Sequence, residues 1–268
     1  MRIVLAALDG SPAARPVIET AVRVGQMTDA GVEAVHVADG LAVTPRLLAE
    51  RAGVPLRLLP GPVLSSLVAA VDDPVVAVAV LGARDTPGGP RPVGSTTLGV
   101  VGMTRKPVVV VPPEAVGGGP LRRLLVPLEG TEASSRAVVE GLCPMLVGDV
   151  ELIVLHVFTD DTLPRMLDRP GDDLELLGRQ FIERNCPTAS GIELRPGPVA
   201  QRVHEVSDER HADLVVLSWS QDSSLGHGRV VHEVLGRSTI PVLLLAGGPL
   251  VPDDGPDSVA RDPLGAPR

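Results

Sequence analysis

The sequence has very few aromatic residues and almost no lysine. Its 268 residues include two phenylalanines, one tryptophan and no tyrosine, and Lys106 is the only lysine among 24 basic residues. Proteins that bind single-stranded nucleic acids need aromatic side chains on which bases stack, and this chain offers hardly any. The Walker motif of P-loop proteins needs a lysine after its glycine-rich turn, and no such glycine–lysine step occurs here. The sequence therefore excludes a classical P-loop.

A disulfide framework, a basic run and a long apolar run are also missing. The formal net charge of −9 argues against general binding to nucleic acids or anionic membranes. Cys143 and Cys186 are the only cysteines, and we interpret both as small buried or half-buried hydrophobes. No run approaches the ~20 apolar residues of a membrane span, and the apolar stretch at 3–8 is shorter than a signal-peptide core. We expect a cytoplasmic protein that binds neither nucleic acid nor membrane.

The chain repeats itself. The segment Leu-Ala-Ala-Leu-Asp-Gly-Ser at 5–11 recurs 120 positions later as Leu-Val-Pro-Leu-Glu-Gly-Thr. Val-His-Val at 35–37 recurs at the same offset as Leu-His-Val. Gly94 stands thirteen residues before a proline that opens an apolar run, and Gly228 does the same. Because these landmarks keep their order, the sequence predicts two related units, the second with 16 extra residues in its middle.

The boundaries of the two units follow from composition. Residues 113–120 are rich in proline and glycine and lack apolar periodicity, which is typical of a linker. Residues 248–268 hold five prolines, four aspartates and little apolar material, which predicts a disordered tail. We therefore expect one domain at residues 1–112, called the first half below, and another at residues 121–247, called the second half.

Each half alternates apolar runs with segments of helical spacing. Strands are predicted at 3–8, 31–37, 56–59, 75–81 and 107–111, and again at 123–128, 150–157, 192–195, 213–217 and 242–245. Helices are predicted after an N-cap at Ser11, over 63–71 and 94–104, and then over 132–146, 173–185, 199–211 and 228–237. This alternation predicts an α/β fold with an open parallel sheet and right-handed crossovers.

Sheets of this kind bind ligands beyond the carboxyl ends of their strands. Asp9 follows the first predicted strand, and Val37 ends the second. The loop from Gly82 to Gly94 is rich in glycine, and it ends in Gly94-Ser95-Thr96 where a helix begins. Backbone N–H groups at a helix N-terminus favour an anion. The same residues also suit a simple turn at Asp9 and an ordinary exposed loop, so both interpretations stay open.

Together these landmarks resemble the universal stress protein family in its tandem form, over about 2–112 and 121–246. The resemblance is carried by Leu8-Asp9-Gly10-Ser11, by the Val-His-Val segment, by the Gly82–Gly94 loop, and by their counterparts in the second half. It implies two tandem open five-stranded parallel sheets in strand order 3-2-1-4-5, Rossmann-like, with helices on both faces. It also implies pairing through the last strands, either between the two halves of one chain or in a homodimer.

The resemblance further implies an ATP site, with Mg²⁺, in the first half. Asp9 would face adenosine, the backbone of Val37 would contact adenine, and the phosphates would lie against Gly82, Gly94, Ser95 and Thr96. This chain departs from the family pattern at Asp85, which stands in place of the second glycine of the loop, and the loop is one residue short. In the second half Glu129 replaces the aspartate and Arg229 the terminal Ser/Thr, so we expect no ATP site of that kind there.

Three functions are therefore open. The first is a regulatory, stress-adaptive protein that binds ATP in its first half. The second is a protein-interaction module without a nucleotide. The third is an ATP-hydrolysing enzyme, for which the sequence offers no water-activating residue. His36 and His156 occupy matching strand-end positions, and we interpret both as structural.

Overall fold

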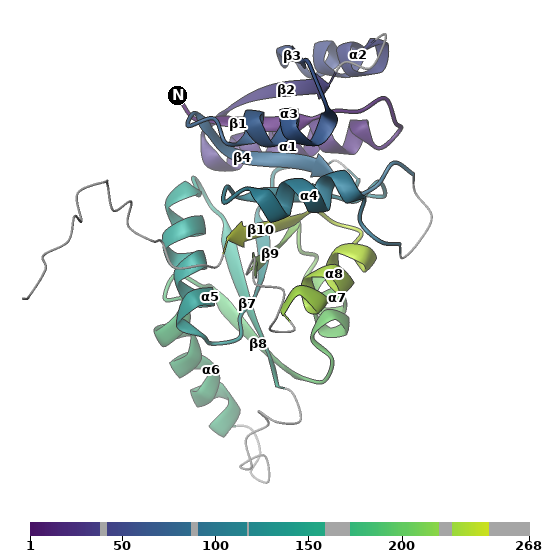
Figure 1. Cartoon of the computed structure of the whole chain (residues 1–268). Coiled ribbons are helices and arrows are strands. Elements are labelled where there is room, and N and C mark those ends of the chain that lie inside the picture. The colour runs from purple at the N-terminus through teal and green to yellow at the C-terminus, as the bar shows by residue number, and fades with distance from the viewer. Residues whose placement is uncertain (38–41, 87–90, 117, 159–171, 220–226, 247–268) are drawn as a thin grey trace, which may run out of the picture.

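A computed structural model describes residues 1–37, 42–86, 91–116, 118–158, 172–219 and 227–246. The predicted tail at 248–268 lies outside the described residues. The described residues form an α/β structure in which strands and helices alternate along the chain (Figure 1). None of the helices in these ranges is both long enough and apolar enough to cross a membrane.

The first half contains five strands and four helices. The strands are β1 (Ile3–Ala7), β2 (Gly31–Val37), β3 (Leu56–Leu59), β4 (Val76–Gly82) and β5 (Val108–Val111). The helices are α1 (Ala14–Thr28), α2 (Val43–Ala52), α3 (Val63–Val71) and α4 (Ser95–Met103). Strand β5 consists of four valines, all buried, as expected for a strand covered on both faces.

The second half repeats this order. Its strands are β6 (Arg123–Pro127), β7 (Glu151–Phe158), β8 (Gly191–Pro196), β9 (Leu214–Trp219) and β10 (Val242–Ala246). Its helical segments are α5 (Glu132–Arg136), a π-helical turn (Ala137–Leu142), a 3₁₀ turn (Cys143–Met145), α6 (Asp172–Asn185), α7 (Val199–Glu209) and α8 (His227–Arg237). Helix α6 lies in the segment that the sequence comparison identified as an insertion.

The ten strands form one sheet in the order β3-β2-β1-β4-β5-β10-β9-β6-β7-β8. Each half has the predicted strand order 3-2-1-4-5, and its strands are parallel. The two halves meet where β5 and β10 pair antiparallel, with Val109 opposite Leu243. The last strand of each half is therefore paired with the other half, and neither is an open edge of the sheet.

Helices cover both faces of the sheet, and each face has one core that spans the two halves. Helix α1 and the helical segment after α5 contribute to one core, in which Val24 and Leu142 are buried together. Helices α3, α4, α7 and α8 contribute to the other, in which Val100 and Val234 are buried. The two parallel sheets expected from the sequence are thus joined by backbone pairing and by shared apolar burial.

Several helix boundaries differ from the sequence-based predictions, and two of the differences have a physical reason. Helix α1 begins at Ala14 after Ala13, and Ser11 belongs to the turn before it, where its hydroxyl donates to Asp9 and accepts from the backbone N–H of Ala13. The predicted helix at 132–146 is α-helical only to Arg136 and then continues as the π and 3₁₀ turns. Pro144 lacks the N–H that a continuing α-helix would use there.

Candidate functional site

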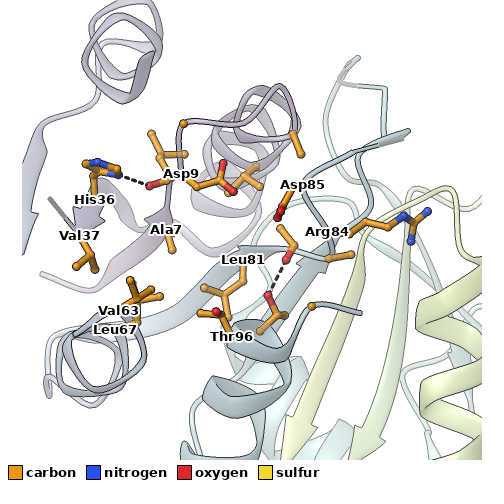
Figure 2. Close-up of a pocket in the computed structure, with 18 of the residues that line it drawn as sticks. Ala7, Asp9, His36, Val37, Val63, Leu67, Leu81, Arg84, Asp85 and Thr96 are labelled. Atoms are coloured by element: carbon orange, nitrogen blue, oxygen red, sulfur yellow. Dashed lines mark hydrogen bonds between the residues drawn. The ribbon is translucent and has the colours of Figure 1, made fainter. Parts of the chain in front are cut away.

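The main candidate site is a cavity of about 330 Å³ at the carboxyl ends of β1, β2 and β4 (Figure 2). Its lining includes every residue proposed from the sequence for ATP: Asp9, Val37, Gly82, Gly94, Ser95 and Thr96. They come together because the carboxyl ends of parallel strands lie at one edge of the sheet and α4 begins beside them. Val63 and Leu67 of α3 form an apolar part of the wall.

The carboxylate of Asp9 is held by the turn that follows β1. Its Oδ1 atom accepts hydrogen bonds from the backbone N–H of Ser11 at 3.0 Å and from the Ser11 hydroxyl at 2.6 Å. Asp9 is exposed at the cavity wall, so the turn fixes its direction without removing it from solvent. The structural role of Asp9 in the turn is therefore compatible with a role of its carboxylate in ligand binding.

A histidine ties the ends of β1 and β2 together. His36 is buried, and its Nδ1–H donates to the carbonyl oxygen of Leu8 at 2.8 Å (Figure 2). The second half has the equivalent bond, from Nδ1 of His156 to the carbonyl oxygen of Leu128 at 2.9 Å. These bonds give both histidines a structural partner, as the interpretation from the sequence expects. In the first half the bond places Val37 at the cavity wall.

The N-terminus of α4 forms the opposite side of the cavity. Gly94 donates to the carbonyl oxygen of Ala83 at 2.8 Å, and the Thr97 hydroxyl donates to that of Gly82 at 2.7 Å. These bonds close the loop onto the end of β4. No side chain caps α4, and a helix leaves the N–H groups of its first turn without internal acceptors. The residues at this end, Ser95 and Thr96, line the cavity and are exposed.

The charge at the wall is negative. Asp9 and Asp85 both line the cavity, and Arg84 is the one lining residue with a cationic side chain among the described residues. The Arg84 guanidinium points away from the cavity (Figure 2) and pairs with Glu114 at 2.8 Å. Its side chain is only 9% exposed, so burial and the ion pair together hold it in that position. Arg84 therefore does not offset the charge of Asp85 inside the cavity.

The corresponding place in the second half is nearly filled. The cavity there measures about 60 Å³. The ring of Phe181, from α6, packs against His156 with 4.4 Å between ring centroids. It also lies against Gly130, where a Cβ atom would come within 2.9 Å of the ring. The insertion thus places an aromatic side chain beside Gly130 and His156, the counterparts of two residues that line the first cavity. Sequence reasoning predicted the helix but not this role, because no local pattern shows where Phe181 points.

Comparisons with known proteins agree with this architecture. Residues 120–246 match the model of the universal stress protein family. A search of curated proteins found no match. A universal stress protein from Archaeoglobus fulgidus has a similar structure, with a TM-score of 0.65 and 16% identity over 92% of this chain and 98% of that one. A functionally unknown protein from Pseudomonas aeruginosa gives a TM-score of 0.65 and 12% identity over 92% of this chain and 93% of that one.

The two structural neighbours are matched over nearly their whole length, so their fold also comprises both halves of this chain. The match to the family model covers the second half. The first half has the same strand order and the same sequence landmarks. The second half therefore matches the universal stress protein family, and the whole chain has a fold in which two such units share one sheet.

Proposed function

We propose that the cavity of the first half binds ATP and that the protein has a regulatory, stress-adaptive role. The observation that carries this proposal is the convergence of Asp9, Val37 and the uncapped start of α4 on one cavity. The cavity volume of about 330 Å³ lies within the usual range for small-molecule sites. The second half contributes no nucleotide site to the proposal, because the cavity at its equivalent place measures only about 60 Å³.

The chemistry of the wall suits the three parts of the nucleotide. Val37, Val63 and Leu67 offer an apolar surface for the adenine ring. The carboxylate of Asp9, held by Ser11, is able to accept hydrogen bonds from ribose hydroxyls. The first-turn N–H groups of α4, with the hydroxyls of Ser95 and Thr96, provide donors for phosphate oxygens.

The two carboxylates favour the magnesium complex over free ATP. Asp85 lines the cavity beside the proposed phosphate region, and the cationic group of Arg84 is turned away. A bound Mg²⁺ lowers the charge of the triphosphate, and this ion commonly bridges phosphate oxygens and one or two carboxylates. We therefore expect Mg-ATP to bind more tightly than ATP in the presence of a chelator.

The experiment is a calorimetric titration of the purified protein with Mg-ATP, preceded by denaturation and chromatography to detect co-purified nucleotide. Gly94→Val is the test variant. Its Cβ would meet only Ala83 O at an ordinary 3.6 Å, so the main effect is a larger side chain at the cavity wall. We expect binding to weaken at least about tenfold, which corresponds to about 1.4 kcal/mol.

The repeat provides matched controls. Gly228→Val changes the equivalent glycine of the second half, where an added Cβ would meet nothing within 4 Å. Asp9→Ala and Glu129→Ala form a second pair at equivalent positions. Loss of binding in the first-half variants alone supports the proposal. Absence of bound nucleotide and of any Mg-ATP signal in the unchanged protein refutes it.

A protein-interaction module without nucleotide is the second candidate function. The observation that favours it is the pair of carboxylates at the cavity wall, together with the small cavity of the second half. It predicts that the melting temperature does not respond to Mg-ATP. Specific binding at 100 times Kd would instead stabilise the fold by about 2.7 kcal/mol. A thermal melt with and without Mg-ATP distinguishes the two candidates.

A further inference from the structure

The loop that lines the first cavity contacts the second half of the chain. Figure 1 shows the segment before α4 close to α8. The backbone N–H of Arg91 donates to the carbonyl oxygen of Gly236, in the last turn of α8, at 3.2 Å. Carbonyl groups in the last turn of a helix have no partner within that helix. The loop therefore supplies a hydrogen bond that α8 cannot make for itself.

The same contact is sterically close. A Cβ atom at Gly236 would lie 3.3 Å from the carbonyl oxygen of Arg91, closer than side chains ordinarily approach. Val93, two residues further along the loop, is buried in the apolar core that also contains Val234 and Leu235 of α8. The absence of a side chain at Gly236 thus lets the loop backbone rest directly on the helix end.

A second attachment comes from the segment between the halves. Arg84 follows β4 at the cavity wall, and its guanidinium pairs with Glu114, which lies after β5. Arg84 is mostly buried, and its Nε and Nη1 atoms have no hydrogen-bond partner among the described residues. A buried cation that lost its carboxylate would carry a large desolvation cost, so this pair holds the beginning of the loop in place.

We propose that Gly236 of α8 is a positioning residue for the cavity of the first half. The end of α8 holds Arg91 and Val93, and through them it sets the position of Gly94 and the start of α4. The second half, whose own cavity is small, thereby determines the shape of the site in the first half. Occupancy of that site and the packing of α8 are then coupled, and this part rests on the proposed function.

The repeat again provides a control. Gly102 of α4 is the residue equivalent to Gly236, at the same offset as Gly94 and Gly228. A Cβ atom at Gly102 would meet nothing within 4 Å. Gly236→Val and Gly102→Val therefore make the same chemical change near the end of equivalent helices. Only the first of them disturbs the loop.

The first measurement needs no ligand. Amide hydrogen exchange is followed at Arg91 and Gly94 in the full chain, with the amides of β1 as an internal reference. Gly236→Val is expected to speed exchange at Arg91 about tenfold or more, while Gly102→Val leaves it unchanged. If Gly236→Val does not fold, Gly236→Ala serves, with a smaller increase expected. Equal exchange in the Gly236 and Gly102 variants would overturn the proposal.

The second measurement is calorimetric titration of the same variants with Mg-ATP. Binding is expected to weaken about threefold or more in Gly236→Val and to match the unchanged protein in Gly102→Val. Faster exchange at Arg91 with unchanged affinity would show that α8 holds the loop without setting the site, which overturns the coupling. If the unchanged protein does not bind Mg-ATP, the proposed function fails, and the exchange experiment still decides whether α8 positions the loop.

Discussion

Two carboxylates, Asp9 and Asp85, follow neighbouring strands of the first half and line the same cavity. Asp9 is fixed by its hydrogen bonds to Ser11, whereas no described side chain with a positive charge points toward Asp85. The residue that could have balanced it, Arg84, is paired with Glu114 outside the cavity. The negative charge of Asp85 thus disfavours an anionic ligand in this cavity.

Replacing Asp85 by glycine should tighten the binding of ATP measured in the presence of a chelator, where no Mg²⁺ offsets the repulsion between the carboxylate and the phosphates. Two like charges about 4 Å apart repel each other by about 1 kcal/mol in water, and removing such a repulsion raises affinity about fivefold. Titration calorimetry measures the change. Asp85→Glu, which keeps the charge, should leave the affinity near that of the unchanged protein. Weaker binding in Asp85→Gly would show that the carboxylate holds the ligand.

The two cysteines should differ in reactivity. Burial raises the pKa of the Cys186 thiol, while Cys143 is partly exposed. At pH 8, iodoacetamide should therefore modify Cys143 in the folded protein and Cys186 only after unfolding, as followed by mass spectrometry. Because the pKa is raised in the folded state, the free energy of unfolding should fall as pH rises above about 8.5, and Cys186→Ala should reduce that fall. Equal labelling of both thiols in the native state would contradict this prediction.

At the scale of elements, α6 packs against the turn that follows β6. Its Phe181 ring occupies the space beside Gly130 and His156, while the first half has no aromatic ring beside the equivalent Gly10 in its described residues. Gly130 has a φ of +84°, a conformation that glycine adopts without steric cost. The turn after β6 and the helix of the insertion therefore depend on each other.

Gly130→Ala should destabilise the protein by about 1–3 kcal/mol, because a left-handed backbone is strained for alanine and the new Cβ would meet Phe181 at 2.9 Å. Gly10→Ala, at the equivalent position of the first half, would meet nothing within 4 Å and should change stability by less than about 0.5 kcal/mol. Urea denaturation measures both. An equal decrease in the free energy of unfolding in both variants would mean that neither the contact with Phe181 nor the backbone conformation of Gly130 contributes to stability.

Most elements were predictable from local pattern, and the exceptions have physical reasons. The buried strands are continuous apolar runs, so β1, β4 and β5 were found to within about one residue. Helix α2 was not predicted, because Pro45 and the mixed polarity of its neighbours hide the helical spacing. The irregular turns after Arg136 were also missed, since hydrogen-bond slippage within a helix leaves no signature in residue spacing.

At the scale of the whole molecule, the antiparallel pair β5–β10 joins the five-stranded sheets of the two halves into one continuous sheet. It turns two strand edges that would invite association with other chains into an internal contact. The two cores, one on each face, continue across this junction. We therefore expect the two halves to unfold together.

Val109→Pro tests this expectation. Val109 pairs with Leu243 at the centre of the junction, and proline would remove a backbone donor and distort the strand. The free energy of unfolding should fall by about 3 kcal/mol or more, and the single transition of the unchanged protein should separate into two. Denaturation monitored by circular dichroism, together with Trp219 fluorescence as a probe of the second half, measures this. Two transitions in the unchanged protein would contradict the expectation.

The sequence by itself determined the repeat, the α/β alternation, the residues of the candidate site and the family they resemble. These properties depend on residue types and their spacing, which the chain shows directly. Only the tertiary structure decided that Arg84 turns to Glu114, that Phe181 packs against His156 and Gly130, and that Gly236 accepts a hydrogen bond from the loop of the first half. Each of these depends on contacts between residues far apart in the chain, and side-chain direction is set by packing rather than by local pattern.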